Sequence, residues 1–114
     1  MNYRQVIAYE NYFEDFLVEQ PEKIQNKIFK ILEAIEFLEQ IPSSYLKHLT
    51  GTDGLYEARI QLGTNIWRIF CFFDEERIVI LLNAFLKKTQ KTPKNELAKA
   101  LYLKQKYYTE KRKK

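Results

Sequence analysis

The alternation of apolar and polar residues predicts a strand and two helices in the first third of the chain. Residues 3–9 alternate as in a short strand, and the apolar residues that follow fall at helical spacing until Pro21 interrupts them. Beyond Pro21, apolar residues recur every three or four positions, at Ile24, Ile28, Ile31, Ile35 and Leu38. This stripe predicts an amphipathic helix that ends near Pro42 and buries its apolar side.

Three strands and a final helix are predicted for the second half of the chain. Leu55 to Leu62, Ile66 to Asp74 and Arg77 to Phe85 are apolar segments separated by short turns, a pattern that favours an antiparallel meander. The middle strand is apolar on both faces, so it needs the helical hairpin on one face and another element on the other. Pro93 marks the start of the last helix, because proline is tolerated at the first helical position.

These elements describe an α+β domain in the order β-α-α-β-β-β-α, with an antiparallel sheet core packed by a helical hairpin and a C-terminal helix. The polar stretch 42–54 is rich in turn residues and is expected to be a surface connection. A length of 114 residues, 46% of them hydrophobic and 30% charged, fits a single domain spanning 1–114.

The same composition bears on where the protein works. No apolar run approaches the ~20 residues that span a bilayer, and the first residues lack the apolar core of a secretory signal. We therefore expect a cytoplasmic protein. The single cysteine, Cys71, lies within the aromatic middle strand and is expected to be a small core residue rather than a nucleophile.

The net charge of +4 is unevenly distributed. Residues 1–85 hold 8 Lys and Arg against 13 Asp and Glu, whereas residues 86–114 hold 11 against 2. A basic segment on an acidic body is typical of a protein with a polyanionic partner, because neutralising phosphates releases counterions. A solvated lysine-rich tail is the alternative for the last five residues taken alone.

Two arginines are predicted to share one face of the sheet. Residues two apart along a strand point to the same face. A two-residue loop at 64–65 would pair Gln61 with Arg68 and Arg59 with Phe70, which places both arginines on one face; a three-residue loop would separate them. For Arg68 alone, an arginine that bridges the core to solvent is an equal alternative.

The next turn extends this row of polar residues. A two-residue loop at 75–76 would pair Arg68 with Asn83, the one polar residue of its strand, and the alternation then continues to Lys87. The predicted polar row consists of Arg59, Gln61, Arg68, Asn83 and Lys87.

The chemistry available to this row is cationic. The sequence has no zinc-ligand spacing, Gly-rich phosphate loop or serine nucleophile elbow, so metal-dependent hydrolysis is disfavoured and no cofactor is expected. Arginine and lysine can hold a phosphate and stabilise its transition-state charge, and RNA carries its own nucleophile, the 2′-hydroxyl. The candidate proton-transfer groups are Lys87 beside Lys88, if burial or neighbouring cations lower the pKa, and His48, which titrates near neutrality unaided.

Three segments carry a resemblance to a known family. GLYEAR at 54–59, WRIF at 67–70 and FLKKTQKTP at 85–93, followed by a lysine-rich helix, resemble the HigB-like branch of the RelE/ParE toxin superfamily. Together they cover more than a third of the chain in the right order.

The resemblance implies a toxin of a toxin–antitoxin system that cleaves messenger RNA in the ribosomal A site without a metal. It implies partnership with a helix-turn-helix antitoxin, the ribosome and mRNA. By resemblance the catalytic residues are Arg59, Arg68, Lys87 and Lys88, and His48 is a further candidate. We expect RNA contacts from Gln61, Asn83, Thr89, Lys91 and Lys94.

The chain also departs from the family's pattern. Some relatives have a lysine where this chain has Glu57, and some have a catalytic tyrosine or histidine near the last helix, which leaves the proton-transfer group open. Two other functions stay open as well. ParE-type relatives bind and poison DNA gyrase without nuclease chemistry, and a toxin-like module without activity would bind only RNA or a partner.

Overall fold

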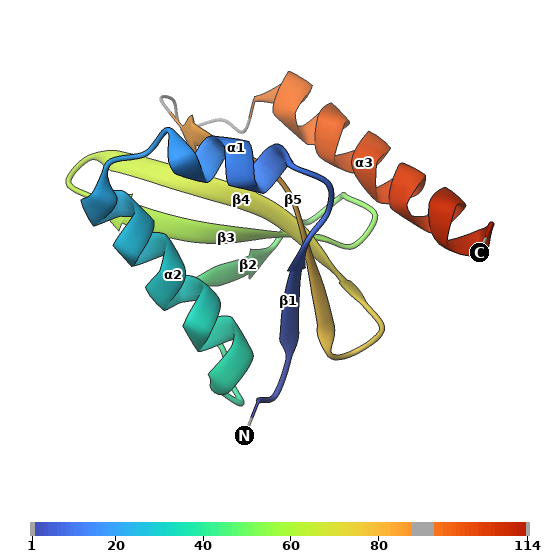
Figure 1. Ribbon diagram of the computed structural model, residues 1–114, viewed down its shortest axis with the longest axis horizontal. Helices are drawn as coiled ribbons and strands as arrows, with labels where there is room; N and C mark the ends of the chain where they lie inside the picture. The colour runs from blue at the N-terminus through green and yellow to red at the C-terminus, as the bar shows by residue number, and fades with distance from the viewer. Residues whose placement is uncertain (1, 88–92, 114) are drawn as a thin grey trace.

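The computed structural model describes residues 2–87 and 93–113, which form three helices and a five-stranded sheet (Figure 1). The elements in chain order are β1 (Gln5–Ala8), α1 (Tyr12–Val18), α2 (Glu22–Phe37), β2 (Leu46–His48), β3 (Leu55–Leu62), β4 (Asn65–Asp74), β5 (Ile78–Lys87) and α3 (Lys94–Arg112). The α+β class and the order of the predicted elements are confirmed. None of these helices has the length and apolarity that crossing a membrane requires, within the residues described.

The sheet has the strand order β1-β5-β4-β3-β2. Strands β3, β4 and β5 form the predicted antiparallel meander, and β1 adds to its far side parallel to β5. The expectation for residues 42–54 as a mere connection is wrong, because β2 lies within this stretch and pairs with β3 through Leu46 and Ala58. Three residues are too few for an alternating pattern to be recognised, and two of them, Lys47 and His48, are exposed.

Helices α1 and α2 cover one face of the sheet. Ile24, Ile28 and Ile35 of α2 are buried against it, as the stripe predicted, and burying each such side chain contributes roughly 1.5–3 kcal/mol. Helix α2 ends at Phe37, earlier than predicted, because Leu38 already has an extended backbone. Cys71 is fully buried on this side, as predicted, and burial raises the pKa of its thiol to about 12.

Helix α3 covers part of the opposite face. Ala100 and Leu103 pack with Leu55, Phe70 and Phe72, so the apolar middle strand is covered on both faces as predicted. Asn83 donates a hydrogen bond of 3.0 Å to the carbonyl of Glu96 in the first turn of α3. The last turn is held at the other end of the sheet, where Lys111 lies 2.8 Å from Asp74. The helix therefore runs from the middle of β5 to the β4–β5 turn and leaves the β3–β4 turn end of this face uncovered.

Candidate functional site

Arg59 and Arg68 lie directly opposite each other on β3 and β4. The turn between these strands consists of Gly63 and Thr64, one residue earlier than predicted, since Leu62 pairs with Asn65. This shift moves each pairing by two positions and so preserves the face. The prediction that the arginines share one face is confirmed, while the predicted partners, Gln61 for Arg68 and Phe70 for Arg59, are wrong.

The two arginine side chains are held close by the type of pairing. The Arg59 N–H points away from β4 and donates to the carbonyl of Tyr45 at 2.9 Å, so Arg59 and Arg68 form a non-hydrogen-bonded pair. In such pairs the Cα atoms are ~4.5 Å apart and the side chains are closest. Like charges directly opposite each other repel, so this arrangement requires compensation.

Glu57 supplies that compensation. It lies two residues before Arg59 on the same face, is fully buried, and forms an ion pair with Nη1 of Arg68. Its Oε2 is also 4.0 Å from Nε of Arg59. Among the residues that the structure describes, two buried atoms of the ion pair have no hydrogen-bond partner, Oε1 of Glu57 and Nε of Arg68. The pair is therefore buried but incompletely satisfied.

Lys87 lies at the end of β5 on the same face. It pairs with Ile66, two residues before Arg68. Burial lowers the pKa of the Lys87 ammonium, and the positive charges of Arg68, Arg59 and Lys47 lower it further, against the opposing effect of Glu57. A lowered pKa makes the ammonium easier to deprotonate, which is the direction that proton transfer by a lysine requires.

Lys47 brings a further cation that the sequence analysis did not single out. It pairs with Glu57 across β2 and β3, and residues directly opposite in a sheet share a face. We call the set Lys47, Glu57, Arg59, Arg68 and Lys87 the basic cluster. It places four cations around one carboxylate, on the part of the sheet that α3 leaves uncovered. Within it, the side chain of Arg59 is 30% exposed and that of Arg68 is 8% exposed.

Asn83 does not belong to this cluster, contrary to the prediction. The turn after β4 is longer than expected, because Asp74 pairs with Ile78, and the register shifts again between Ile69 and Cys71. Arg68 therefore faces Phe85 rather than Asn83. The Asn83 side chain is buried and holds α3, which leaves no surface for RNA to reach it.

His48 also lies apart from the basic cluster. It pairs with Tyr56, and the two rings are 5.1 Å apart. Tyr56 packs with the core on the α1 and α2 face, so the position of His48 in β2 faces away from the arginines, although at this edge of the sheet His48 also lines a pocket with Lys47 and with Leu97 of α3. This position gives no support to His48 as the proton-transfer group.

The remaining predicted residues are placed as follows. Gln61 is exposed on the cluster's face, beside Arg59. Lys94 is the first residue of α3 and is exposed. Lys88, Thr89 and Lys91 lie outside the described residues. No group of three or more His, Cys, Asp or Glu side chains that could hold a metal ion is found in 2–87 and 93–113.

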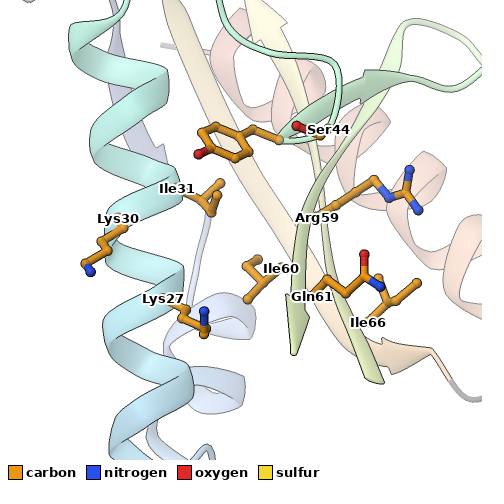
Figure 2. Close-up of a pocket in the computed structure, with 9 residues that line it drawn as sticks. Lys27, Lys30, Ile31, Ser44, Arg59, Ile60, Gln61 and Ile66 are labelled. Atoms are coloured by element: carbon orange, nitrogen blue, oxygen red, sulfur yellow. The ribbon is translucent and has the colours of Figure 1, made fainter. Parts of the chain in front are cut away.

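Beside the basic cluster lies a groove of about 340 Å³ between α2 and the edge of β3. Figure 2 shows Ile31 and Lys27 on the side of α2 toward Ile60 of β3, Lys30 extending from α2 away from the strand, and Arg59 and Gln61 on the far side of the strand. Arg59 therefore contributes both to the basic cluster and to the groove.

Comparisons with known proteins agree with this architecture. The family described as phage derived protein Gp49-like matches residues 15–105 of the chain. The chain is also similar in structure to a chain of the archaeal RelE–RelB complex from Pyrococcus horikoshii OT3, with a TM-score of 0.50 and 17% sequence identity. That similarity covers 72% of this chain and 92% of the archaeal one. No curated protein sequence matches the chain.

Proposed function

The chain belongs to the phage-derived Gp49-like family and has a RelE-like fold, and we propose that it is a HigB-like toxin of a toxin–antitoxin system, a ribosome-dependent mRNA endonuclease that works without a metal. The observation that carries this proposal is the basic cluster. Four cations lie around one buried carboxylate at the end of the sheet that α3 does not cover, and Arg59, whose side chain is 30% exposed, is the arginine that a phosphodiester can reach.

The first step is to hold the scissile phosphate. Arg59, the more exposed arginine, binds a non-bridging oxygen, and the charge of Arg68 stabilises the negative charge that builds up in the transition state. Glu57 keeps Arg68 in position through their ion pair. Removing Glu57 would therefore disturb the orientation of Arg68 rather than remove a group that contacts the substrate.

The second step is proton transfer. The 2′-hydroxyl of the RNA attacks the adjacent phosphorus and the P–O5′ bond breaks; the departing 5′-oxygen takes a proton from water, and the products are a 2′,3′-cyclic phosphate and a 5′-hydroxyl. Lys87, with its lowered pKa, accepts the proton of the 2′-hydroxyl. RNA contacts by Gln61, Lys94, Thr89 and Lys91, and a role for Lys88 beside Lys87, remain part of the proposal.

The partners follow from this function. The protein acts in the cytoplasm on mRNA in the ribosome, and a helix-turn-helix antitoxin neutralises it. The RelE–RelB complex as a structural neighbour supports an antitoxin partner. Co-expression with the product of an adjacent gene should restore growth, and the two proteins should co-purify; failure of every adjacent gene product to do so would contradict this part.

The proposal is tested by expression in a bacterial host. We expect translation arrest with cleaved transcripts for the wild type, and loss of both for Lys87→Ala and Arg68→Ala. Thermal melting of both purified variants shows whether loss of activity comes from unfolding, a concern for Arg68→Ala because it leaves Glu57 buried without its partner. Wild-type toxicity in both variants would contradict the proposed site. A DNA-damage response with intact transcripts would instead support gyrase poisoning, and normal growth an inactive module.

A further inference from the structure

The groove beside the basic cluster exists because β2 stops short. The last backbone hydrogen bond on this side of β3 runs from Arg59 N–H to the Tyr45 carbonyl. In the described part of the chain, no strand pairs with residues 60–62 on that side. Since N–H and C=O groups alternate along a strand, those of Gln61 point toward the same open edge as those of Arg59. The sheet edge, α2 and residues 44–45 thus enclose the groove.

The groove combines an apolar floor with basic walls. Ile31, Ile60 and Ile66 supply apolar surface, and Lys27, Lys30 and Arg59 supply the charged groups, as Figure 2 shows. No acidic residue lines it, and no ion pair among the described residues involves the two lysines. Arg59 lies on the other side of β3 from these lysines, so basic side chains border the open edge of β3 from both faces of the sheet.

An aromatic side chain completes the lining. Tyr45 borders the groove and is 36% exposed. Its backbone is fixed by the hydrogen bond from Arg59, so the ring has an anchored base. Exposed aromatic rings beside basic groups are the usual means of binding single-stranded nucleic acid, because every base has a face that can stack.

From this lining we infer that the groove binds one nucleotide of single-stranded RNA next to the scissile phosphate. Its base packs against Tyr45 and the isoleucines, and its phosphate lies between Lys27 and Lys30. The volume of about 340 Å³ is in the lower part of the range for small-ligand sites, about 300–1,000 Å³, which suits a single nucleotide. Arg59 joins the groove to the basic cluster, so the RNA strand crosses the edge of β3. This inference rests on the proposed function for its substrate.

The direct test measures binding of a fluorescein-labelled single-stranded RNA oligonucleotide to the purified protein by anisotropy. We expect Lys27→Ala/Lys30→Ala to bind at least ten-fold more weakly than the wild type at about 0.1 M salt. The dependence of log K on log salt should also become shallower by about 0.7, since the two lysines neutralise one phosphate and each neutralised phosphate on a single strand contributes about 0.7.

A matched control removes the same charge elsewhere. Lys23 and Arg77 are exposed and do not line the groove, so Lys23→Ala/Arg77→Ala should stay within two-fold of the wild type. An equal loss in both double variants would overturn the inference, because it would reflect net charge alone. Wild-type affinity in Lys27→Ala/Lys30→Ala, or no measurable binding by the wild type, would overturn it as well.

Tyr45 distinguishes a nucleotide from a general anion. We expect Tyr45→Ala to weaken RNA binding about ten-fold and Tyr45→Phe to restore it, because stacking needs the ring and not the hydroxyl. A polyglutamate peptide serves as the competing anion. If Tyr45→Ala leaves RNA binding unchanged, or weakens polyglutamate binding as much as RNA binding, the groove is an anion site and the inference fails.

These results separate the inference from the proposed function. RNA binding through the groove without any cleavage of ribosome-bound mRNA would support the inference and contradict the nuclease. Cleavage that depends on Lys87, together with unchanged RNA binding in Lys27→Ala/Lys30→Ala, would support the nuclease and overturn the groove.

Discussion

The same face of the sheet carries two buried carboxylates, one at each end of the area that α3 covers, and their surroundings differ. At the β4–β5 turn, Asp74 accepts hydrogen bonds from Tyr107, from Tyr108 at 3.4 Å and from Lys111 at 2.8 Å. We call these four residues the Asp74 cluster. At the other end Glu57 faces the four cations of the basic cluster, and atoms of the Glu57–Arg68 ion pair lack partners.

The difference separates a structural cluster from a candidate site. In the Asp74 cluster one carboxylate meets one cation and two hydroxyl groups, and together they fasten α3 to the sheet. In the basic cluster the cations outnumber the carboxylate and no helix covers them. A surplus of positive charge held close together is costly unless an anion binds there, which is why the second arrangement favours a phosphate ligand.

The largest stability effect is expected when Glu57 is removed. Glu57→Ala leaves Arg68 buried without compensation, and breaking a buried ion pair in this way costs about 3–5 kcal/mol. Urea denaturation should therefore show a large fall in the midpoint. Replacing both residues, Glu57→Leu with Arg68→Leu, should recover much of the loss; equal destabilisation by the single and double variants would contradict an ion pair as the cause.

Removing Asp74 should cost less. Asp74→Ala loses its hydrogen bonds, about 1–3 kcal/mol, but the Lys111 left behind is 48% exposed and can be hydrated. The expected order of denaturation midpoints is wild type, then Asp74→Ala, then Glu57→Ala. The reverse order of the two variants would contradict the inference that Arg68, and not Lys111, is the cation that cannot be hydrated once its carboxylate is removed.

A smaller effect is expected on the stability of the fold at acidic pH. Burial would raise the pKa of Asp74, but hydrogen bonds from Lys111 and Tyr107 lower it below its ordinary value. Its contribution to stability is therefore complete above the ordinary carboxyl pKa of about 3.9 and is lost as the pH falls through the lower, folded value. Asp74→Asn should flatten this part of the stability–pH curve, measured by thermal melting, and an unchanged slope would count against the assignment.

The pH dependence of cleavage also distinguishes the two clusters, through Lys87 of the basic cluster and Lys111 of the Asp74 cluster. Since the pKa of Lys87 is lowered and the neutral amine accepts the proton, the rate of cleavage should rise with pH and level off below the ordinary lysine pKa of about 10.4. Mutation of Lys111, whose pKa is raised by its hydrogen bond to Asp74, should not change the pH range over which the cleavage rate rises. If the cleavage rate of Lys87→Ala still rose with pH over the same range, the proton transfer would belong to another group.

Much of the basic cluster could be predicted from the sequence, because side chains alternate between the two faces along a strand and a shift of two positions leaves each residue on the same face. The β3–β4 turn is displaced by one residue, which changes every pairing by two and keeps Arg59 and Arg68 together. The prediction fails for Asn83 for another reason: the longer turn and the register shift together move the partner of Arg68 by two positions, from Asn83 to Phe85, and Asn83, still on that face, is covered by α3. Local sequence does not determine such irregularities, which depend on how both layers pack.

Other parts of the site depend on contacts distant in the chain. Lys47 joins the cluster only because β2 pairs with β3, and a three-residue strand leaves no recognisable pattern. Glu57 was identified only as a departure from the family's pattern, and its meaning depends on the burial of the Arg68 ion pair. Its position two residues before Arg59, and therefore on the same face of the strand, was the available signal.

The central claim, that the basic cluster and not the Asp74 cluster performs the chemistry, is tested by cleavage of mRNA programmed in purified ribosomes. The comparison is between Lys87→Ala and Lys111→Ala, one lysine from each cluster, at a temperature where both variants are folded. We predict that Lys87→Ala lowers the single-turnover cleavage rate at least 100-fold and that Lys111→Ala stays near the wild type, in keeping with the 10²–10⁴-fold contribution of general acid–base catalysis. Equal rates in the two variants would contradict the account.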